Sequence, residues 1–130
     1  MSATINHLSV VARHPKAAAD ALAKLAGGRS SPFLPLPGAY VCFLGKDWAD
    51  VFVEFYPPHH RLIEGKDRTP HFDHVAGPEV ANATHVNLSV HRSLEEIARV
   101  ADELGLRHGL RMNFVDVWLE DELLFEIAPH

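Results

Sequence analysis

Two glutamates stand alone inside apolar runs of the sequence. Glu54 lies in VFVEFYP (51–57), Glu126 lies in LLFEIAP (123–129), and both runs end on proline. A lone carboxylate in an apolar strand is costly unless it is paired, protonated or bound to a metal. Two histidines, His7 in INHLSVV and His85 in ATHVNLS, stand in the same order ahead of the glutamates. These four side chains could hold a divalent ion through two nitrogens and two oxygens, with coordination sites left for water or substrate.

The strand pattern predicts which residues surround each candidate ligand. Alternate residues of a β-strand point to the same face, so each ligand shares a face with the residues two positions away. The expected companions are Ile5, Ser9 and Val11 for His7, Phe52 and Tyr56 for Glu54, Asn87 and Ser89 for His85, and Leu124 and Ala128 for Glu126.

The four candidates belong to an internal repeat, in which His7 matches His85 and Glu54 matches Glu126. Each copy begins with a strand, about 4–12 and 83–91, which is followed by a helix and three extended segments. The extended segments are 31–37, 39–45 and 51–57 in the first copy and 106–112, 114–120 and 123–129 in the second. The prediction is an α+β fold of two βαβββ modules whose curved mixed sheets surround a metal site.

Both helices carry local start and stop signals. Pro15 suits the first position of one helix, and Gly27 or Gly28 would end it. The apolar face expected there is Ala18, Ala21, Leu22 and Leu25. Ser93 and Glu96 form a capping box for the other helix, which Gly105 would end. Its expected apolar stripe is Leu94, Ile97, Ala98, Ala101 and Leu104.

The chain is expected to be one domain, 1–130, with module one at about 4–57, a linker at about 58–82 and module two at about 83–130. Prolines 32, 35 and 37 predict that the second strand of module one is broken or lies at a sheet edge. The linker, rich in Pro, His and Gly, predicts a long connection with at most a short strand or turn, which crosses the site or lies against a partner subunit.

Composition excludes several classes of protein. A hydrophobic content of 47% is typical of a globular chain, and no run has the length of a membrane span. The net charge of −5, with basic residues scattered singly, makes nucleic acid an unexpected partner. The N-terminus lacks the pattern of a signal peptide, so a cytoplasmic protein is expected. Cys42, the one cysteine, is expected to be a small buried residue rather than a nucleophile.

The sequence resembles the vicinal oxygen chelate superfamily, which includes glyoxalase I, fosfomycin-resistance proteins, extradiol dioxygenases and bleomycin-binding proteins. The residues that carry the resemblance are His7 in NHLSV, Glu54 in FVEFYP, His85 in THVNLSV and Glu126 in FEIAP. The resemblance implies that these four residues are metal ligands on the first and last strands of each module. It also implies a homodimer.

The ligand set discriminates within that superfamily. Glyoxalase I enzymes typically use His or Gln, Glu, His and Glu in this order, which favours a metal-dependent lyase or isomerase that acts on a small substrate with vicinal oxygens. Glu54 or Glu126 would then be the catalytic base of a reaction with an enediolate-like intermediate. The metal would be Ni, Co, Zn or Mn. One alternative is an Fe(II)-dependent dioxygenase in which Glu54 is not a ligand, and another is a non-enzymatic protein that binds a small molecule such as an antibiotic.

Departures from the glyoxalase pattern bear on the substrate. Positions that help to hold glutathione in bacterial glyoxalase I are occupied here by Val11 and Pro58, and the familiar DPDG turn before the last strand is replaced by EDE (120–122). These differences argue against a glutathione conjugate as the substrate.

The remaining histidines leave a second metal cluster open. His59, His60, His71 and His74 could form one with Asp73, although their spacing matches no established ligand pattern. The histidines at 14, 91, 108 and 130 are expected to be surface or capping residues.

Overall fold

The computed structural model describes residues 5–64, 66, 70–77, 85–121 and 123–130. Three predictions fall partly outside these ranges: the strand starts at 4 and 83, the last part of the linker, and Glu122 of the predicted turn. The elements of module one are β1 (His7–Val11), α1 (Pro15–Ala26), β2 (Arg29–Pro32), β3 (Tyr40–Phe43) and β4 (Phe52–Tyr56). Next come β5 (His60–Glu64) and β6 (Pro70–His74). The elements of module two are β7 (His85–Val90), α2 (Leu94–Glu103), β8 (Arg107–Arg111), β9 (Phe114–Leu119) and β10 (Leu123–Pro129).

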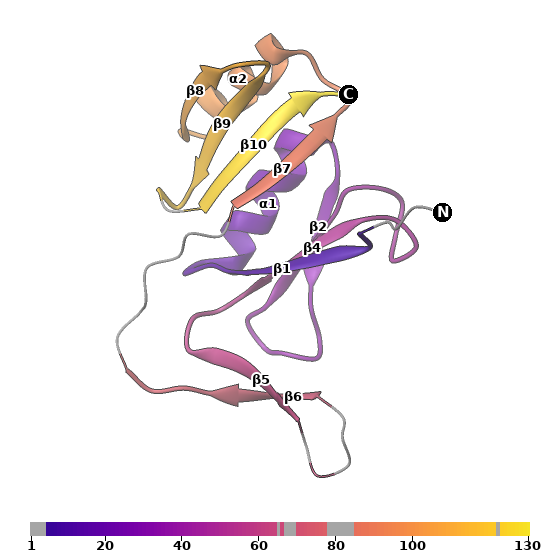
Figure 1. The fold of residues 1–130 in the computed structure, drawn as a ribbon, viewed down its shortest axis with the longest axis vertical. Helices are drawn as coiled ribbons and strands as arrows, with labels where there is room; N and C mark the ends of the chain where they lie inside the picture. The colour runs from indigo at the N-terminus through magenta and orange to yellow at the C-terminus, as the bar shows by residue number, and fades with distance from the viewer. Residues whose placement is uncertain (1–4, 65, 67–69, 78–84, 122) are drawn as a thin grey trace.

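The two modules have the same topology, which confirms the predicted pair of βαβββ units. One sheet has the strand order β1-β4-β3-β2 and the other β7-β10-β9-β8 (Figure 1). In each sheet the first strand pairs in parallel with the last one, while the other pairings are antiparallel. The first and last strands of a module therefore lie side by side, and the candidate ligands lie on these strands.

The helix ends follow the predicted signals. Pro15 is at the start of α1, and Gly27 ends it in the left-handed conformation, with φ of 78°. In α2 the hydroxyl of Ser93 accepts a hydrogen bond from the backbone N–H of Glu96, and the Glu96 carboxylate accepts one from the N–H of Ser93. Local sequence chemistry is thus sufficient to place both helices.

The second strand of module one differs in position from its prediction. It is β2, four residues long, which lies at the edge of the sheet as expected but begins at Arg29 rather than at Ser31. Pro35 and Pro37, which lack an N–H group to donate, fall in the turns that follow this strand.

The linker contains more regular structure than predicted. Strands β5 and β6 form an antiparallel hairpin, in which Arg61 lies opposite Asp73 and its Nε donates to the Asp73 carboxylate at 3.0 Å. Phe72 of this hairpin packs edge-on against Tyr56 of β4, with ring centroids 5.1 Å apart. The hairpin projects away from the two sheets (Figure 1).

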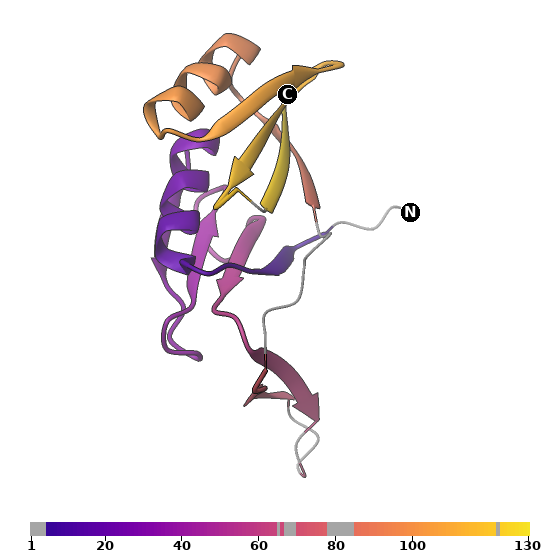
Figure 2. The same ribbon diagram turned by 90° about the vertical axis from the view of Figure 1, so that its left-hand side faces the viewer.

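Both helices lie on the same side of the sheets, and the opposite sheet faces are left open (Figure 2). On the helix side, buried residues of the two modules form one hydrophobic cluster, in which the rings of Phe55 and Phe125 lie 6.2 Å apart. Among the described residues, neither helix is long and apolar enough to cross a membrane.

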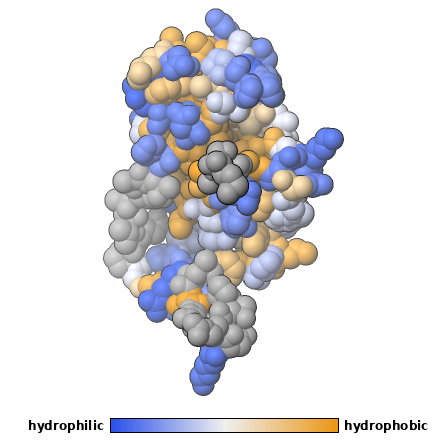
Figure 3. Space-filling model, turned by 45° about the vertical axis from the view of Figure 1, so that its right-hand side comes forward, coloured by the Kyte–Doolittle hydropathy of each residue, from blue (hydrophilic) through white to orange (hydrophobic). Residues whose placement is uncertain are grey.

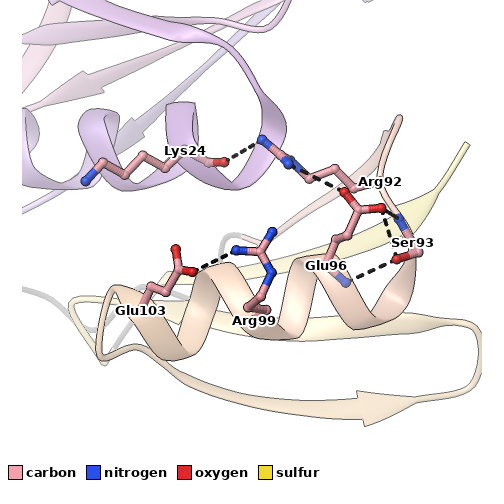
Figure 4. A network of polar contacts seen from close by, with 6 residues as sticks. All are labelled: Lys24, Arg92, Ser93, Glu96, Arg99 and Glu103. Carbon is pink, nitrogen blue, oxygen red and sulfur yellow. Dashed lines mark hydrogen bonds and ion pairs between the residues drawn. The ribbon is translucent and has the colours of Figure 1, made fainter.

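Polar contacts also connect the modules. Arg92, just ahead of α2, donates to the backbone oxygen of Lys24 at 3.2 Å and lies 3.8 Å from the Glu96 carboxylate (Figure 4). In the other direction, the carboxylate of Glu120 accepts hydrogen bonds from the backbone N–H groups of Arg13 and His14, at the start of α1. His14 is the N-cap residue and makes no side-chain cap, so these two bonds connect Glu120 to the backbone at and just ahead of the N-cap.

Candidate metal centre

Glu54 is a buried carboxylate on the open face of the first sheet. It is only 6% exposed, and its strand neighbours in register are Ser9 on β1 and Val41 on β3. The hydroxyl of Ser9 donates to its Oε2 at 2.8 Å, and the hydroxyl of Tyr56 donates to the same oxygen. These two donors compensate for the loss of water around the carboxylate.

Tyr56 is held as a neutral hydrogen-bond donor. Burial, and after it the hydrogen bond to Glu54, raise the pKa of its phenol to about 12. Because the phenol stays protonated over the physiological range, it can act as a permanent donor to Glu54.

His7 lies on the same open face, two residues along the register from Glu54. Its partner on β4 is Phe52, and the two rings stack at 4.8 Å with an angle of 10° between their planes. His7 is exposed, so its ring is accessible from the open face.

Glu126 occupies the equivalent place in the second sheet, with a different environment. Its side chain is 13% exposed, its Oε1 lies 3.6 Å from Nε2 of His85, and its Oε2 lies 3.5 Å from a guanidinium nitrogen of Arg111. Its register partner on β9 is Asp116, to which Arg111 donates two hydrogen bonds, at 2.8 and 3.0 Å. The hydrogen bond to Asp116 is the main cause that raises the pKa of Arg111.

The structure therefore brings the four predicted ligands together as two pairs. His85 and Glu126 are in contact, while His7 and Glu54 lie on adjacent strands with the same register offset as that pair. Within the ranges that the structure describes, no cluster of three or more His, Cys, Asp or Glu side chains is positioned to hold a metal ion. Each pair fits half of a metal site, because its donors are those that Zn or Ni prefers, but one chain as described does not unite the two halves.

Sequence reasoning placed Ser9 and Tyr56 on the faces of the ligands but missed their role as donors to Glu54. It did not identify Arg111 or Asp116 at all. The available signal was the register: once β8, β9 and β10 are aligned, Asp116 falls beside Glu126.

The alternative histidine cluster does not form a metal site among the described residues. His60 lies opposite His74, with ring centroids 5.6 Å apart, but its Nδ1 faces the backbone oxygens of Pro57 and Pro58. Asp73 is engaged with Arg61. Cys42 is buried as expected, and burial raises the pKa of its thiol to about 12.

Comparison with known proteins finds solved structures of the same fold. No protein-family model matches the sequence, and no curated protein matches it. Among solved structures, a lactoylglutathione lyase from Agrobacterium tumefaciens matches with a TM-score of 0.67 and 14% identity, over 98% of this chain and 94% of that one. The fosfomycin resistance protein FosX from Listeria monocytogenes, complexed with Mn(II) and sulfate, gives 0.62 and 9%, over 99% and 91%. An oxidase, ChaP-H2, gives 0.62 and 16%, over 100% and 95%.

These neighbours are all members of the vicinal oxygen chelate superfamily, so the predicted resemblance is confirmed and the chain has their fold. They include a lyase, a resistance protein and an oxidase, and they therefore leave the specific activity of this chain open.

Proposed function

We propose that this protein is a metal-dependent lyase or isomerase of the glyoxalase I type, which acts on a small substrate bound through vicinal oxygens. The observation that carries the proposal is the repetition of one His and one Glu at equivalent register positions on the open faces of both sheets. The four ligands would be His7, Glu54, His85 and Glu126. A divalent metal would polarise a substrate carbonyl and thereby acidify the adjacent C–H.

The active unit in this proposal is a homodimer. The open faces of both sheets are on one side of the chain (Figure 2), and this side exposes hydrophobic residues across its middle (Figure 3). The first sheet of one copy would face the second sheet of the other, so that each His–Glu pair meets its complement across a two-fold axis. Such pairing would assemble two complete sites, each with ligands from both chains.

Glu126 is the better candidate for the group that moves the proton. Glu54 is fixed by two hydroxyl donors, whereas Glu126 is less buried and has Arg111 beside it as an alternative partner. A base needs to reach the carbon acid and then return the proton, and a carboxylate with two stable positions can do both. Glu54 would hold its position throughout.

Mixed dimers would test both the ligands and their division between chains. A His7→Ala chain and a His85→Ala chain should each lose divalent-metal binding, measured by calorimetry and elemental analysis. In a dimer that contains one chain of each kind, one site carries both substitutions and the other is intact, so half of the parent's metal content should return. If each site belonged to a single chain, no binding would return.

An iron-dependent dioxygenase is the second candidate. The engagement of Glu54 by Ser9 and Tyr56 favours it, since a carboxylate that already has two partners could stand off the metal and leave His7, His85 and Glu126 as ligands. Ferrous iron in the purified protein, together with oxygen uptake, would support this function over the first. Absence of any bound metal and of turnover would instead favour a small-molecule binding protein.

A further inference from the structure

The first sheet carries an apolar groove on the side of the sheet that bears its candidate ligands. The groove has a volume of about 490 Å³ and is lined by Ser31, Pro32, Phe33, Leu34, Pro35 and Trp48. None of these side chains is charged. Leu34 and Trp48 are 86% and 57% exposed, which is costly for such residues unless the surface is used.

The register places this groove on the same face as Glu54. Ser31 on β2 lies opposite Val41 on β3, and Val41 lies opposite Glu54 on β4. Two strand spacings, about 10 Å, therefore separate the groove from the candidate metal centre.

Each aromatic wall of the groove contacts a neighbour of a candidate ligand. Trp48 packs edge-on against Phe52, with centroids 4.9 Å apart, and Phe52 stacks on His7. On the other side Phe33 packs edge-on against Tyr56 at 5.9 Å, and Tyr56 donates to Glu54. Ring contacts thus connect both walls of the groove to the surroundings of His7 and Glu54.

The loop that carries Trp48 is ordered by its own hydrogen bonds. The carboxylate of Asp50 accepts from the N–H of Lys46 at 2.7 Å, and that of Asp47 accepts from the N–H of Ala49 at 2.8 Å. A side chain at Gly45 would come within 2.4 Å of Asp50, so glycine is needed for this closure. Trp48 is therefore positioned before a ligand arrives, which lowers the entropy cost of binding.

The second sheet lacks these parts in the region that the structure describes. The position equivalent to Ser31 is Gly109, and a short turn after Leu119 replaces the loop that carries Trp48. The nearby Arg111 is bound to Asp116. The two sheets would therefore present chemically different ends to a ligand that lies between them.

We propose that this groove is a subsite for an uncharged aromatic ring of the substrate, held on Trp48 and Phe33 while vicinal oxygens at its other end reach the metal centre. The inference rests on the proposed function for the oxygen end of the substrate only. The groove has the size and the apolar lining of small-molecule sites, and rings pack well on the edges and faces of Trp and Phe. The substrate class is an aryl compound with two adjacent oxygens.

Two hydroxamates that share one chelating group would test the subsite. 4-Phenylbutyrohydroxamate carries a phenyl ring on a three-carbon spacer, which is long enough to reach across two strand spacings, and butyrohydroxamate has the same spacer without the ring. On Zn(II)-loaded protein, calorimetry should give an affinity for 4-phenylbutyrohydroxamate about tenfold or more above that for butyrohydroxamate. Trp48→Ala should bring this ratio close to one, whereas Leu110→Ala, which removes another exposed apolar side chain, from β8, should leave it unchanged. Because Leu34 is 86% exposed, Leu34→Asp provides a second variant that should keep the fold and should also reduce the ratio.

A third probe separates the subsite from the metal chemistry. Benzamide, which has the ring but chelates weakly, should shift the indole N–H signal of Trp48 in the NMR spectrum of metal-free protein. If butyrohydroxamate binds and 4-phenylbutyrohydroxamate binds no more tightly, the subsite is wrong and the proposed function stands. If neither hydroxamate binds but benzamide shifts Trp48, the metal function is wrong and the ring site stands. No shift by benzamide, or a Trp48→Ala variant that dissociates the dimer without a change in the ratio, would overturn the subsite.

Discussion

Glu54 and Glu126 hold equivalent positions in two equivalent sheets, yet their surroundings differ. Glu54 is buried, accepts hydrogen bonds from two hydroxyl groups and has Val41 as its neighbour on the next strand. Glu126 has Asp116 in the place of that valine, and a guanidinium beside both carboxylates. In the first module the charge of Glu54 is stabilised by two neutral hydroxyl donors. In the second module Arg111 lies beside two negative charges, those of Glu126 and Asp116.

The difference indicates that the two carboxylates have different roles. Two hydroxyl donors hold the buried Glu54 carboxylate in one place, because moving it would break both hydrogen bonds. An ion pair at the surface is weak and can be exchanged for another partner. The same strand position thus carries a carboxylate held by two hydroxyl groups in one module, the fixed carboxylate, and in the other a carboxylate that we expect to exchange partners, the exchangeable carboxylate.

Glu54 and Glu126 can be compared in this way only if both modules belong to one folding unit. Substitutions in the core that the modules share should have the largest effect and test this point. Phe55→Ala and Phe125→Ala should each lower the free energy of unfolding by about 3–5 kcal/mol, since each empties a fully buried site between the sheets and helices. Urea denaturation followed by circular dichroism measures the change. Ile63→Ala, in the exposed hairpin, is the control with a small effect. Two separate transitions in either core variant would contradict a common core.

The next largest effect concerns the two carboxylates as ligands. Glu54→Gln and Glu126→Gln should each reduce divalent-metal affinity by about 100-fold or more, because a charged donor becomes a weak neutral one. Glu126→Gln should also abolish turnover while the fold is kept. Calorimetric metal titration and thermal denaturation give both readouts, and Glu95→Gln on the exposed face of α2 is the matched control. Full metal affinity in the Glu126 variant would remove it from the site.

Loss of a hydroxyl donor to Glu54 should lower the free energy of unfolding more than loss of the guanidinium beside Glu126. Ser9→Ala and Tyr56→Phe should each cost about 1–2 kcal/mol in the free energy of unfolding, because each leaves a buried carboxylate with one donor fewer. Arg111→Gln should have a smaller effect, since that side chain is exposed. Chemical denaturation of the three variants tests the order. An Arg111 variant less stable than both hydroxyl variants would reverse the assignment of fixed and exchangeable carboxylate.

A smaller change is expected in metal affinity when Arg111 is replaced. Arg111→Gln should raise divalent-metal affinity severalfold, because Glu126 no longer has a competing cation and the site loses a nearby positive charge. The control is Arg107→Gln on the same strand, where the guanidinium lies over the ring of Trp118 rather than beside Glu126. A fall in affinity would show that Arg111 orders Glu126 for the metal instead of competing with it.

The smallest effect is expected for a substitution at a position where both modules have a small, buried residue. Cys42 on β3 corresponds to Val117 on β9, and both are fully buried. Because burial holds the thiol protonated, with its pKa at about 12, Cys42→Val should change the free energy of unfolding by less than about 1 kcal/mol. Thermal denaturation checks this, and a labelling assay on the parent protein should find the thiol inert until the chain unfolds.

Features with local causes could be predicted from the sequence. The capping box of Ser93 and Glu96 and the stop at Gly27 depend on residues within one helical turn, and the structure has both. The repeat likewise sufficed to place the candidate ligands on paired first and last strands. The β5–β6 hairpin was missed because its support comes from cross-strand pairing and from the contact of Phe72 with Tyr56, neither of which has a local signature. The Arg111–Asp116 pair depends on strand register, and how the two half-sites meet depends on a second chain.

The turn that closes the last hairpin has a consequence for recombination between modules. Glu120, with φ of 56°, accepts hydrogen bonds from the backbone N–H groups of residues 13 and 14. Any residue except proline could donate from positions 13 and 14, so this contact requires a particular side chain only at position 120. Grafting another hairpin turn in place of Glu120 would leave the N–H groups of Arg13 and His14, at the entry to the helix of the other module, without this acceptor. A chimera built from halves of two such proteins therefore needs an acceptor in this turn, even when every residue of the metal centre has been preserved.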